Sequence, residues 1–105
     1  MNFVGKTIEI RYSSGLEVRA RYDSTTAMTW EALSGPAKGR QGTEIIAAAE
    51  VAADVYFISW IEASGTSVSN VVDLGARTVH AYVTFQASEG RQGYLDHGTI
   101  VSLAP

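Results

Sequence analysis

The chain has 105 residues, of which 46% are hydrophobic and 18% are charged, and its formal net charge is −3. This length suits one compact domain spanning residues 1–105, and the composition is that of a folded protein rather than a disordered one. The negative charge and the scattered arginines and lysines argue against a nucleic-acid-binding surface.

The absence of cysteine excludes disulfides and thiolate metal sites and suits the cytoplasm. The first residues do not read as a secretory signal, and no stretch approaches the roughly 18 apolar residues of a membrane span. We therefore expect a cytoplasmic protein with neither nucleic acid nor membrane among its partners.

Short segments of alternating apolar and polar residues follow one another along the chain, separated by turns rich in glycine, serine and aspartate. Short strands joined by tight turns favour an antiparallel up-and-down barrel, because closure removes exposed sheet edges. We predict an all-β barrel of about eight strands. They cover approximately residues 7–12, 16–22, 28–33, 43–50, 55–62, 66–72, 78–85 and 94–103.

The alanine-rich stretch at residues 47–53 leaves its local structure open. Alternation extends the fourth predicted strand into it, whereas alanine has the highest helix propensity and would also suit one or two helical turns.

The segment 55–62 is apolar on both of its faces, although a barrel has only one interior. The outer row therefore needs a cover, which a second copy of the chain or a terminal segment folded over the wall would supply. We expect a homodimer and keep the terminal segment as the alternative. The inward row is Tyr56, Ile58, Trp60 and Glu62, and the outward row includes Val55, Phe57 and Ile61.

Three residues are candidates for catalysis. Glu62 ends an aromatic row, where burial would favour the neutral acid and suit it to general acid/base work; a solvated carboxylate at the rim is the plainer alternative. Arg40 lies in a glycine-rich loop from which its guanidinium could clamp a carboxylate, or it is simply a solvated loop residue. Tyr12 closes an apolar row and either presents its hydroxyl to the same cavity or only packs.

The aromatic and aliphatic residues that share the inward faces would line a ligand cavity, although the two tryptophans would equally serve to fill the core. The predicted ligand is a small molecule that is aromatic or carries a carboxylate. His80 and His97 lack a third ligand at metal-binding spacing, so we expect neither a metal nor another cofactor. The predicted ligand-binding residues are Ile10, Trp30, Tyr56, Ile58 and Trp60.

The order of several short motifs along nearly the whole chain resembles the MoaF-like family of small lipocalin-type (calycin-like) barrels. These motifs are Gly5-Lys6, Tyr12 to Glu17, Gly39-Arg40, Val55 to Thr66 and Val79 to Phe85.

The segment from Ser59 to Thr66 is also similar to a motif of bacterial phenolic acid decarboxylases, Ser-Trp-Thr-Glu-Pro-Thr-Gly-Thr. That similarity implies proton transfer by Glu62, orientation of the substrate by Arg40, and a substrate contact from Tyr12. Ile10 stands where those enzymes have the first tyrosine of a Tyr-x-Tyr pair.

Three functions remain open from the sequence. The barrel could be a cofactor-free lyase or isomerase that uses a buried Glu62, a ligand-binding protein without catalysis, or a structural oligomer whose interior is filled by side chains.

Overall fold

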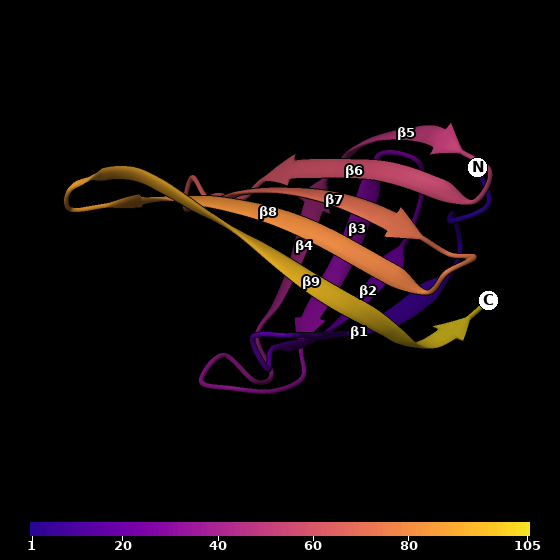
Figure 1. Ribbon diagram of the computed structural model, residues 1–105, viewed down its shortest axis with the longest axis horizontal. Helices are drawn as coiled ribbons and strands as arrows, with labels where there is room; N and C mark the ends of the chain where they lie inside the picture. Colours follow the sequence, from indigo (N-terminus) through magenta and orange to yellow (C-terminus); the bar gives the residue numbers. More distant parts are fainter.

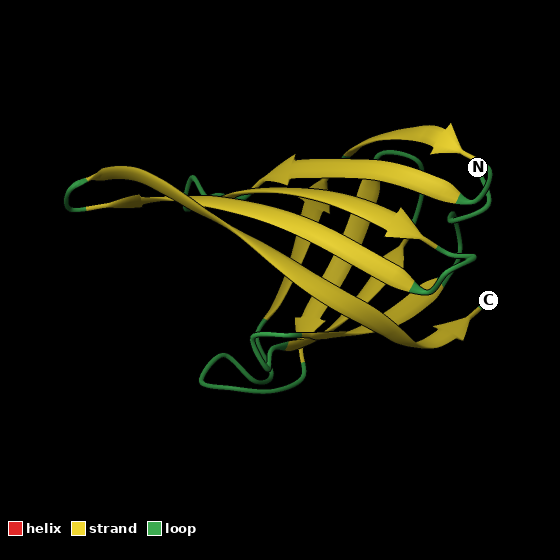
Figure 2. Ribbon diagram, in the orientation of Figure 1, coloured by secondary structure: helices red, strands yellow, loops and turns green.

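The computed structural model describes residues 1–105 and contains nine strands and no helix (Figures 1 and 2). The prediction of an all-β antiparallel barrel is confirmed. The strands are β1 (Thr7–Tyr12), β2 (Glu17–Tyr22), β3 (Ala27–Ala32), β4 (Gln41–Ile45), β5 (Ala47–Ala52), β6 (Val55–Ile61), β7 (Ser67–Asp73), β8 (Thr78–Ala87) and β9 (Gly90–Ala104).

The strands form one antiparallel sheet in the order β4-β3-β2-β1-β9-β8-β7-β6-β5. The pairing of β1 with β9 brings the beginning and the end of the chain together and curls the sheet into a nearly closed barrel (Figure 1). The remaining seam lies between the two edge strands, β4 and β5, which follow each other in the chain with only Ile46 between them.

The count of about eight strands differs from the observed nine because the predicted strand 43–50 is divided at Ile46. This residue is buried, and its backbone N–H donates to the carbonyl of Thr26, so the chain turns a corner there. The alanine-rich residues 47–52 form β5 and not a helix, because their backbone groups pair with β6. Tertiary pairing here overrides a local helix preference.

One end of the barrel is filled. Phe3, which precedes the first strand, is fully buried and packs edge-on against Tyr22 and Tyr56, with ring centroids 5.2 and 5.0 Å apart. Around these rings lie further fully buried side chains, Ile8, Ile58, Val72 and Val79. This packed cluster occupies the end of the barrel that we call the closed end.

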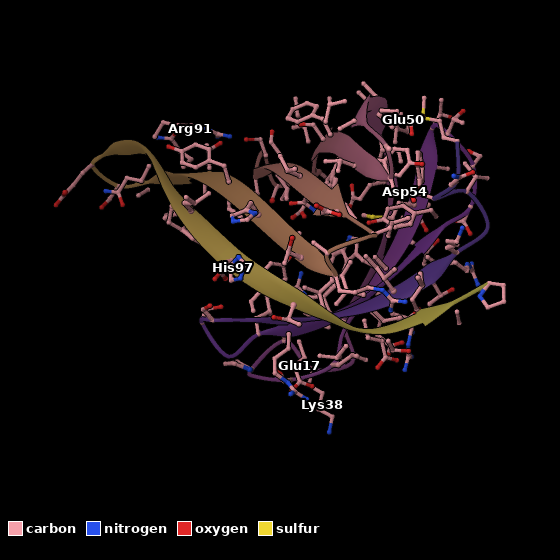
Figure 3. The ribbon with its side chains drawn as sticks, turned by 45° about the vertical axis from the view of Figure 1, so that its right-hand side comes forward. Glu17, Lys38, Glu50, Asp54, Arg91 and His97 are labelled. Carbon is pink, nitrogen blue, oxygen red and sulfur yellow. The ribbon has the colours of Figure 1, made fainter.

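The opposite end is open, and the β8–β9 hairpin projects beyond it (Figure 1). The hairpin is paired over its full length, from Thr78–Thr99 to Ala87–Gly90. Arg91 at its far end donates to the carbonyl of Gly65 and to Thr84, which ties the projection to the β6–β7 turn (Figure 3).

The outer surface differs between the two sides of the barrel. On β1 to β3 it is charged, and Arg19 bridges Glu9 and Glu31 across neighbouring strands. On β6 it is apolar apart from Ser59, and Phe57 and Ile61 are 41% and 76% exposed. Neither terminal segment covers that row, because Phe3 plugs the barrel end and β9 pairs with β1 and β8. The structure has no helix long and apolar enough to cross a membrane.

Candidate functional site

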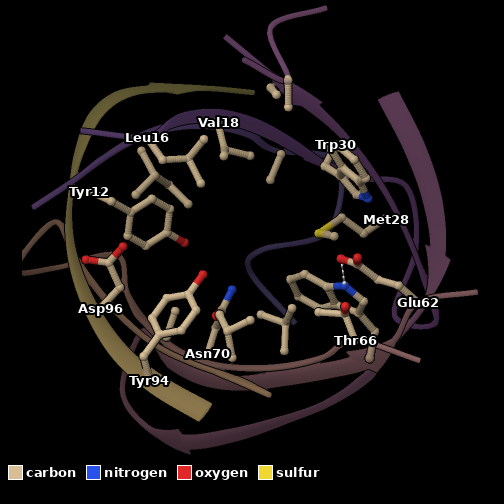
Figure 4. A pocket seen from close by; sticks show the side chains of 18 of the residues that line it. Tyr12, Leu16, Val18, Met28, Trp30, Glu62, Thr66, Asn70, Tyr94 and Asp96 are labelled. Carbon is tan, nitrogen blue, oxygen red and sulfur yellow. Dashed lines mark hydrogen bonds between the residues drawn. The ribbon is translucent and has the colours of Figure 1, made fainter. Parts of the chain in front are cut away.

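A cavity of about 270 Å³ opens at the end of the barrel opposite Phe3. Seven of the strands contribute to its wall, and 15 of its 19 lining residues are hydrophobic. The polar and aromatic groups around it are drawn in Figure 4. The lining residues that bear on function are Ile10, Tyr12, Trp30, Trp60, Glu62, Thr66, Asn70, Tyr94 and Asp96.

The wall is built by the two-residue period of the strands. Alternate residues of a strand face the same side of the sheet, so Tyr94, Asp96, Gly98 and Ile100 of β9 all point inward. Along this strand the inward positions change from an apolar residue at the closed end to polar ones at the mouth. The wall of the cavity is therefore apolar at its base and more polar at its opening.

Tyr12 is positioned by a glycine opposite it. Tyr12 pairs with Gly98, and a Cβ at Gly98 would lie 2.5 Å from Ile10 Cγ2 and 3.0 Å from Tyr12 Cδ1. Since glycine leaves that space free, the Tyr12 ring lies across β9 and its hydroxyl points into the cavity (Figure 4). Burial, together with the charge of Asp96 and the neighbouring Tyr94, raises the pKa of Tyr12 above its ordinary value, so this hydroxyl stays protonated at neutral pH.

Asp96 and Tyr94 stand beside Tyr12. The Asp96 carboxylate accepts hydrogen bonds from the Ser14 hydroxyl at 2.7 Å and from the backbone N–H of His97 at 2.9 Å. The hydroxyl of Tyr94 is directed toward the centre of the cavity from the neighbouring position (Figure 4). The two tyrosines and the aspartate thus form one polar side of the opening.

Asn70 is the polar residue deepest in the wall. It is only 3% exposed, and its Oδ1 has no hydrogen-bond partner in the protein. Its neighbours across the sheet are Ile58 and Ala81, neither of which has a polar side chain. A buried acceptor without a donor is unfavourable by about 1–3 kcal/mol unless something else supplies the donor.

Glu62 lies on the other side of the opening. It is half-buried, and its Oε2 accepts a hydrogen bond of 3.2 Å from Trp60 Nε1, drawn as the dashed line in Figure 4. The expectation of a fully buried acid is wrong, because Glu62 follows the last residue of β6 and so lies where the barrel opens to solvent. It remains a wall residue of the cavity.

Arg40 is exposed and is not among the residues that line the cavity. The loop before β4 folds back on itself through hydrogen bonds from Gly39 N to Ala32 O and from Arg40 N to Ala37 O. This turn places Ala37 at the cavity and leaves Arg40 outside it. The structure therefore brings Glu62 and Tyr12 to one cavity without the predicted guanidinium.

The predicted ligand-binding residues divide between the two ends of the barrel. Ile10, Trp30 and Trp60 line the cavity, whereas Tyr56 and Ile58 are fully buried in the core and do not. The Trp30 ring crosses over Gly42 and donates its Nε1–H to Glu44 at 2.8 Å. It acts as a fixed wall because both its ring and its one donor are engaged.

Four polar residues of the wall were not predicted from the sequence, although the alternation of inward and outward residues along the strands indicates them. Counting back by twos from the apolar Ile100 places Asp96 and Tyr94 inside, and Asn70 stands between Val68 and Val72 on an inward row. Thr66 follows from the same count on the residues before β7. Extending the alternation to strand ends would have found all four.

No group of three or more histidine, aspartate or glutamate side chains is arranged to hold a metal ion. His80 and His97 face each other across β8 and β9 with ring nitrogens 3.3 Å apart, and both are exposed. The pair lies on the outer surface of the barrel, away from the cavity-lining residues. Figure 3 shows His97 on β9.

Comparison with known proteins supports the fold and the resemblance. The chain is similar to the solved structure described as "putative beta-lactamase from Burkholderia vietnamiensis", with 30% sequence identity, a TM-score of 0.83, and coverage of 99% of this chain and 95% of that chain. The comparison with curated proteins returned no match. A family model described as MoaF-like matches residues 4–100. The predicted resemblance is confirmed, and the chain belongs to the MoaF-like family.

Proposed function

We propose that this MoaF-like barrel binds a small, largely apolar molecule in the cavity at its open end. The observation that carries the proposal is the combination of an apolar wall, with 15 hydrophobic residues among 19, and a few convergent polar groups at one side. Ligand sites in proteins have this composition.

The size of the cavity limits the ligand. A cavity of 150 Å³ is large enough for benzene, so a volume of about 270 Å³ suits a ligand of roughly ten non-hydrogen atoms. One or two fused rings with a short substituent fit that limit.

A purely structural barrel is the weaker proposal. A structural role would be served by side chains filling the whole interior, as they do around Phe3. The open end instead keeps space next to Asn70, whose unpaired Oδ1 is unfavourable for stability alone.

Catalysis is a second candidate, and the position of Glu62 favours it. A carboxylate in the wall of a binding cavity can accept or donate a proton to a bound molecule, which typically contributes a rate factor of ~10²–10⁴. In a lyase or isomerase of this kind, Glu62→Gln would reduce turnover by about 100-fold or more while changing ligand affinity much less. An equal reduction in turnover and in ligand affinity would show that Glu62 contributes only to binding.

The description of the Burkholderia protein as a beta-lactamase is not carried over to this chain. Among the lining residues there is no serine, cysteine or lysine, the side chains that most often attack an acyl group or activate its attacker. The proposal for this chain is therefore binding, with proton transfer as its only catalytic extension.

Thermal denaturation in the presence of small aromatic compounds tests the proposed function. A ligand that binds only the folded state stabilises it by about 2.7 kcal/mol at a concentration 100 times its dissociation constant. Ala81→Phe is the matched variant, because Ala81 lines the cavity and the larger ring would fill it. Ala104→Phe, at an exposed position at the end of β9 and outside the cavity, is the control.

Stabilisation of the native chain and of Ala104→Phe, but not of Ala81→Phe, is the expected result. If compounds of this size stabilise none of the three proteins, or stabilise Ala81→Phe equally, the cavity is not the binding site.

We also propose that the protein is a homodimer through the outer face of β6. What supports this is the exposed apolar row, to which Val71 of β7 adds by pairing with Phe57. Stable interfaces are built from such surface. Sedimentation of the native chain should give twice the monomer mass, and Ile61→Asp should give the monomer; a monomeric native chain would refute the dimer.

A further inference from the structure

The only two histidines of the chain stand opposite each other on the outer wall of the barrel. His80 of β8 pairs with His97 of β9 in the antiparallel register, so both side chains lie on the same face of the sheet. Their ring centroids are 4.7 Å apart, and His80 Nε2 lies 3.3 Å from His97 Nδ1. Two imidazole nitrogens therefore meet at an exposed position outside the cavity.

The separation of these two nitrogens is that of two ligands of one zinc ion. Zn–N bonds are about 2.0–2.1 Å long, and the tetrahedral angle between two of them places the ligand nitrogens about 3.3–3.4 Å apart. A metal ion can therefore bind both nitrogens after rotation of the rings, without movement of the backbone. Imidazole is a good ligand for Zn²⁺, whereas Mg²⁺ and Ca²⁺ select oxygen.

The backbone that carries the two rings is held on both sides. β8 is hydrogen-bonded to β7 and β9, and β9 is hydrogen-bonded to β8 and β1. At His97 itself, the carbonyl accepts from the backbone N–H of Ser13 at 2.7 Å, and the N–H donates to the Asp96 carboxylate at 2.9 Å. Ligands on a fixed frame lose little conformational freedom when a metal binds, which favours binding.

The charged groups near the histidine pair do not oppose a cation. On β1, the outward residue beside β9 is Arg11, whose guanidinium is bound to Glu17 at 3.2 Å. On β7, the residue opposite His80 is the uncharged Val71. Asp96 adds a carboxylate next to His97 in the chain, and the net charge of the whole chain is −3. Both the local and the overall charge therefore favour a positive ion.

We propose that His80 Nε2 and His97 Nδ1 together bind one Zn²⁺ ion, with water in the remaining coordination positions. The ion clips β8 to β9 on the outer wall, directly behind Asp96, which lines the cavity from the opposite face of β9. This inference goes beyond the proposed function and does not depend on it. It departs from the expectation of no metal, which counted only protein ligands, because water can complete the coordination.

Calorimetry of Zn²⁺ binding to the full chain without an affinity tag tests the site, because the two histidines are then the only imidazoles present. The titration would contain an excess of Mg²⁺, which occupies weak carboxylate sites but not imidazoles. We expect one Zn²⁺ per chain, and the NMR signals of both imidazole rings should shift together as the ion is added.

Two variants assign the binding to the pair. His80→Gln and His97→Gln should each weaken Zn²⁺ binding by about tenfold or more, since loss even of a group that only orients a metal ligand weakens binding by about 10–100-fold. The double variant should bind no more tightly than either single variant. Glu89→Gln, at the exposed tip of the β8–β9 hairpin, removes a carboxylate far from the pair and should bind Zn²⁺ as the native chain does.

Thermal denaturation with Zn²⁺ gives a second measurement. The ion should raise the melting temperature of the native chain and of Glu89→Gln but not that of the histidine variants, because a ligand of the folded state stabilises that state. Without Zn²⁺ all of these proteins should melt alike, since the substituted side chains are exposed.

Three results would overturn the inference. They are absence of Zn²⁺ binding to the native chain, equal affinity in the native chain and in both histidine variants, and a loss confined to one variant, which would assign the ion to a single imidazole. None of them bears on the cavity as a binding site, because both histidines lie outside it.

Discussion

The two ends of this barrel are made from the same strands and differ in what their inward side chains do. At the closed end, Phe3, Tyr22 and Tyr56 interlock and are almost completely buried. At the open end, Tyr12 and Tyr94 face the cavity, and Asn70 keeps an acceptor unpaired. One end therefore supplies stability, whereas the other contains a cavity and an unpaired acceptor that reduce it. Under the proposed function, this cavity is where the ligand binds.

The largest expected loss of stability comes from a substitution at the closed end. Phe3→Ala removes the ring that fills the barrel between Tyr22 and Tyr56, and such truncations reduce the free energy of unfolding by about 3–5 kcal/mol. Urea denaturation measures the loss. Val4→Ala, at the exposed neighbouring position, should change it by less than about 0.5 kcal/mol. Equal effects of the two would mean that Phe3 does not close the barrel.

A smaller loss is expected from crowding the open end. In Gly98→Ala the new methyl group meets Ile10 at 2.5 Å and Tyr12 at 3.0 Å, so both must move. Overpacking of this kind reduces stability by about 1–3 kcal/mol. The displaced Tyr12 ring should also weaken binding of any ligand found in the cavity.

Gly75→Ala is the control for Gly98→Ala. A Cβ there would meet only Asp73 Oδ1, at 3.4 Å, which is ordinary contact. If both alanine variants unfold at the same urea concentration, the close approach of Tyr12 to β9 is not what determines the effect.

One substitution at the open end is expected to stabilise the protein. Asn70→Leu replaces the unpaired acceptor with an apolar group of similar shape and should raise the free energy of unfolding by about 1 kcal/mol. A gain in stability would sharpen the contrast between the two ends. Destabilisation of the ligand-free protein would show instead that the amide is satisfied within the fold.

The smallest expected effect is a loss of folding stability that appears only in alkaline solution. Burial raises the pKa of Tyr22, and burial with the charge of Asp96 raises that of Tyr12, both above the ordinary value. Above pH ~10, where tyrosines of the unfolded chain ionise, the folded protein holds more protons, so stability falls as the pH rises. This stabilising contribution is complete below that pH.

Urea midpoints measured between pH 9 and pH 11 test the alkaline prediction. Tyr22→Phe and Tyr12→Phe should each make the fall less steep, because each removes one group whose pKa differs between the folded and unfolded states. Between pH 6 and pH 8 neither variant should change the pH dependence. A native chain with constant stability up to pH 11 would contradict the raised pKa values.

The fold was predictable from the sequence because alternation and turns are local. Residues 55–62 show the inward row of β6 without any knowledge of its neighbours. The division of 43–50 at Ile46 was not predictable, since the alternation continues through the corner and only the pairing of each half with a different strand reveals it. The strand at 47–52 likewise depends on β6 and not on its alanines.

The site was predicted in part for the same reason. Tyr12, Trp30 and Glu62 lie on inward rows, and their place in the wall followed from counting by twos. Arg40 lies in a loop, where no period fixes direction, and the turn at Gly39 carries it outside the wall. Asp96 and Tyr94 were within reach of the same count, because alternate residues back from Ile100 face inward along β9.

The seam between β4 and β5 has a mechanical consequence. Each of these strands is hydrogen-bonded to a neighbouring strand on one side only, so no backbone hydrogen bonds between strands close the barrel at this seam. The two strands are connected covalently through Ile46. The circumference of the barrel is therefore not fixed by an uninterrupted ring of hydrogen-bonded strands. Amide hydrogens on the unpaired edges of β4 and β5 should therefore exchange with solvent sooner than those of β1 and β9, which are hydrogen-bonded on both sides.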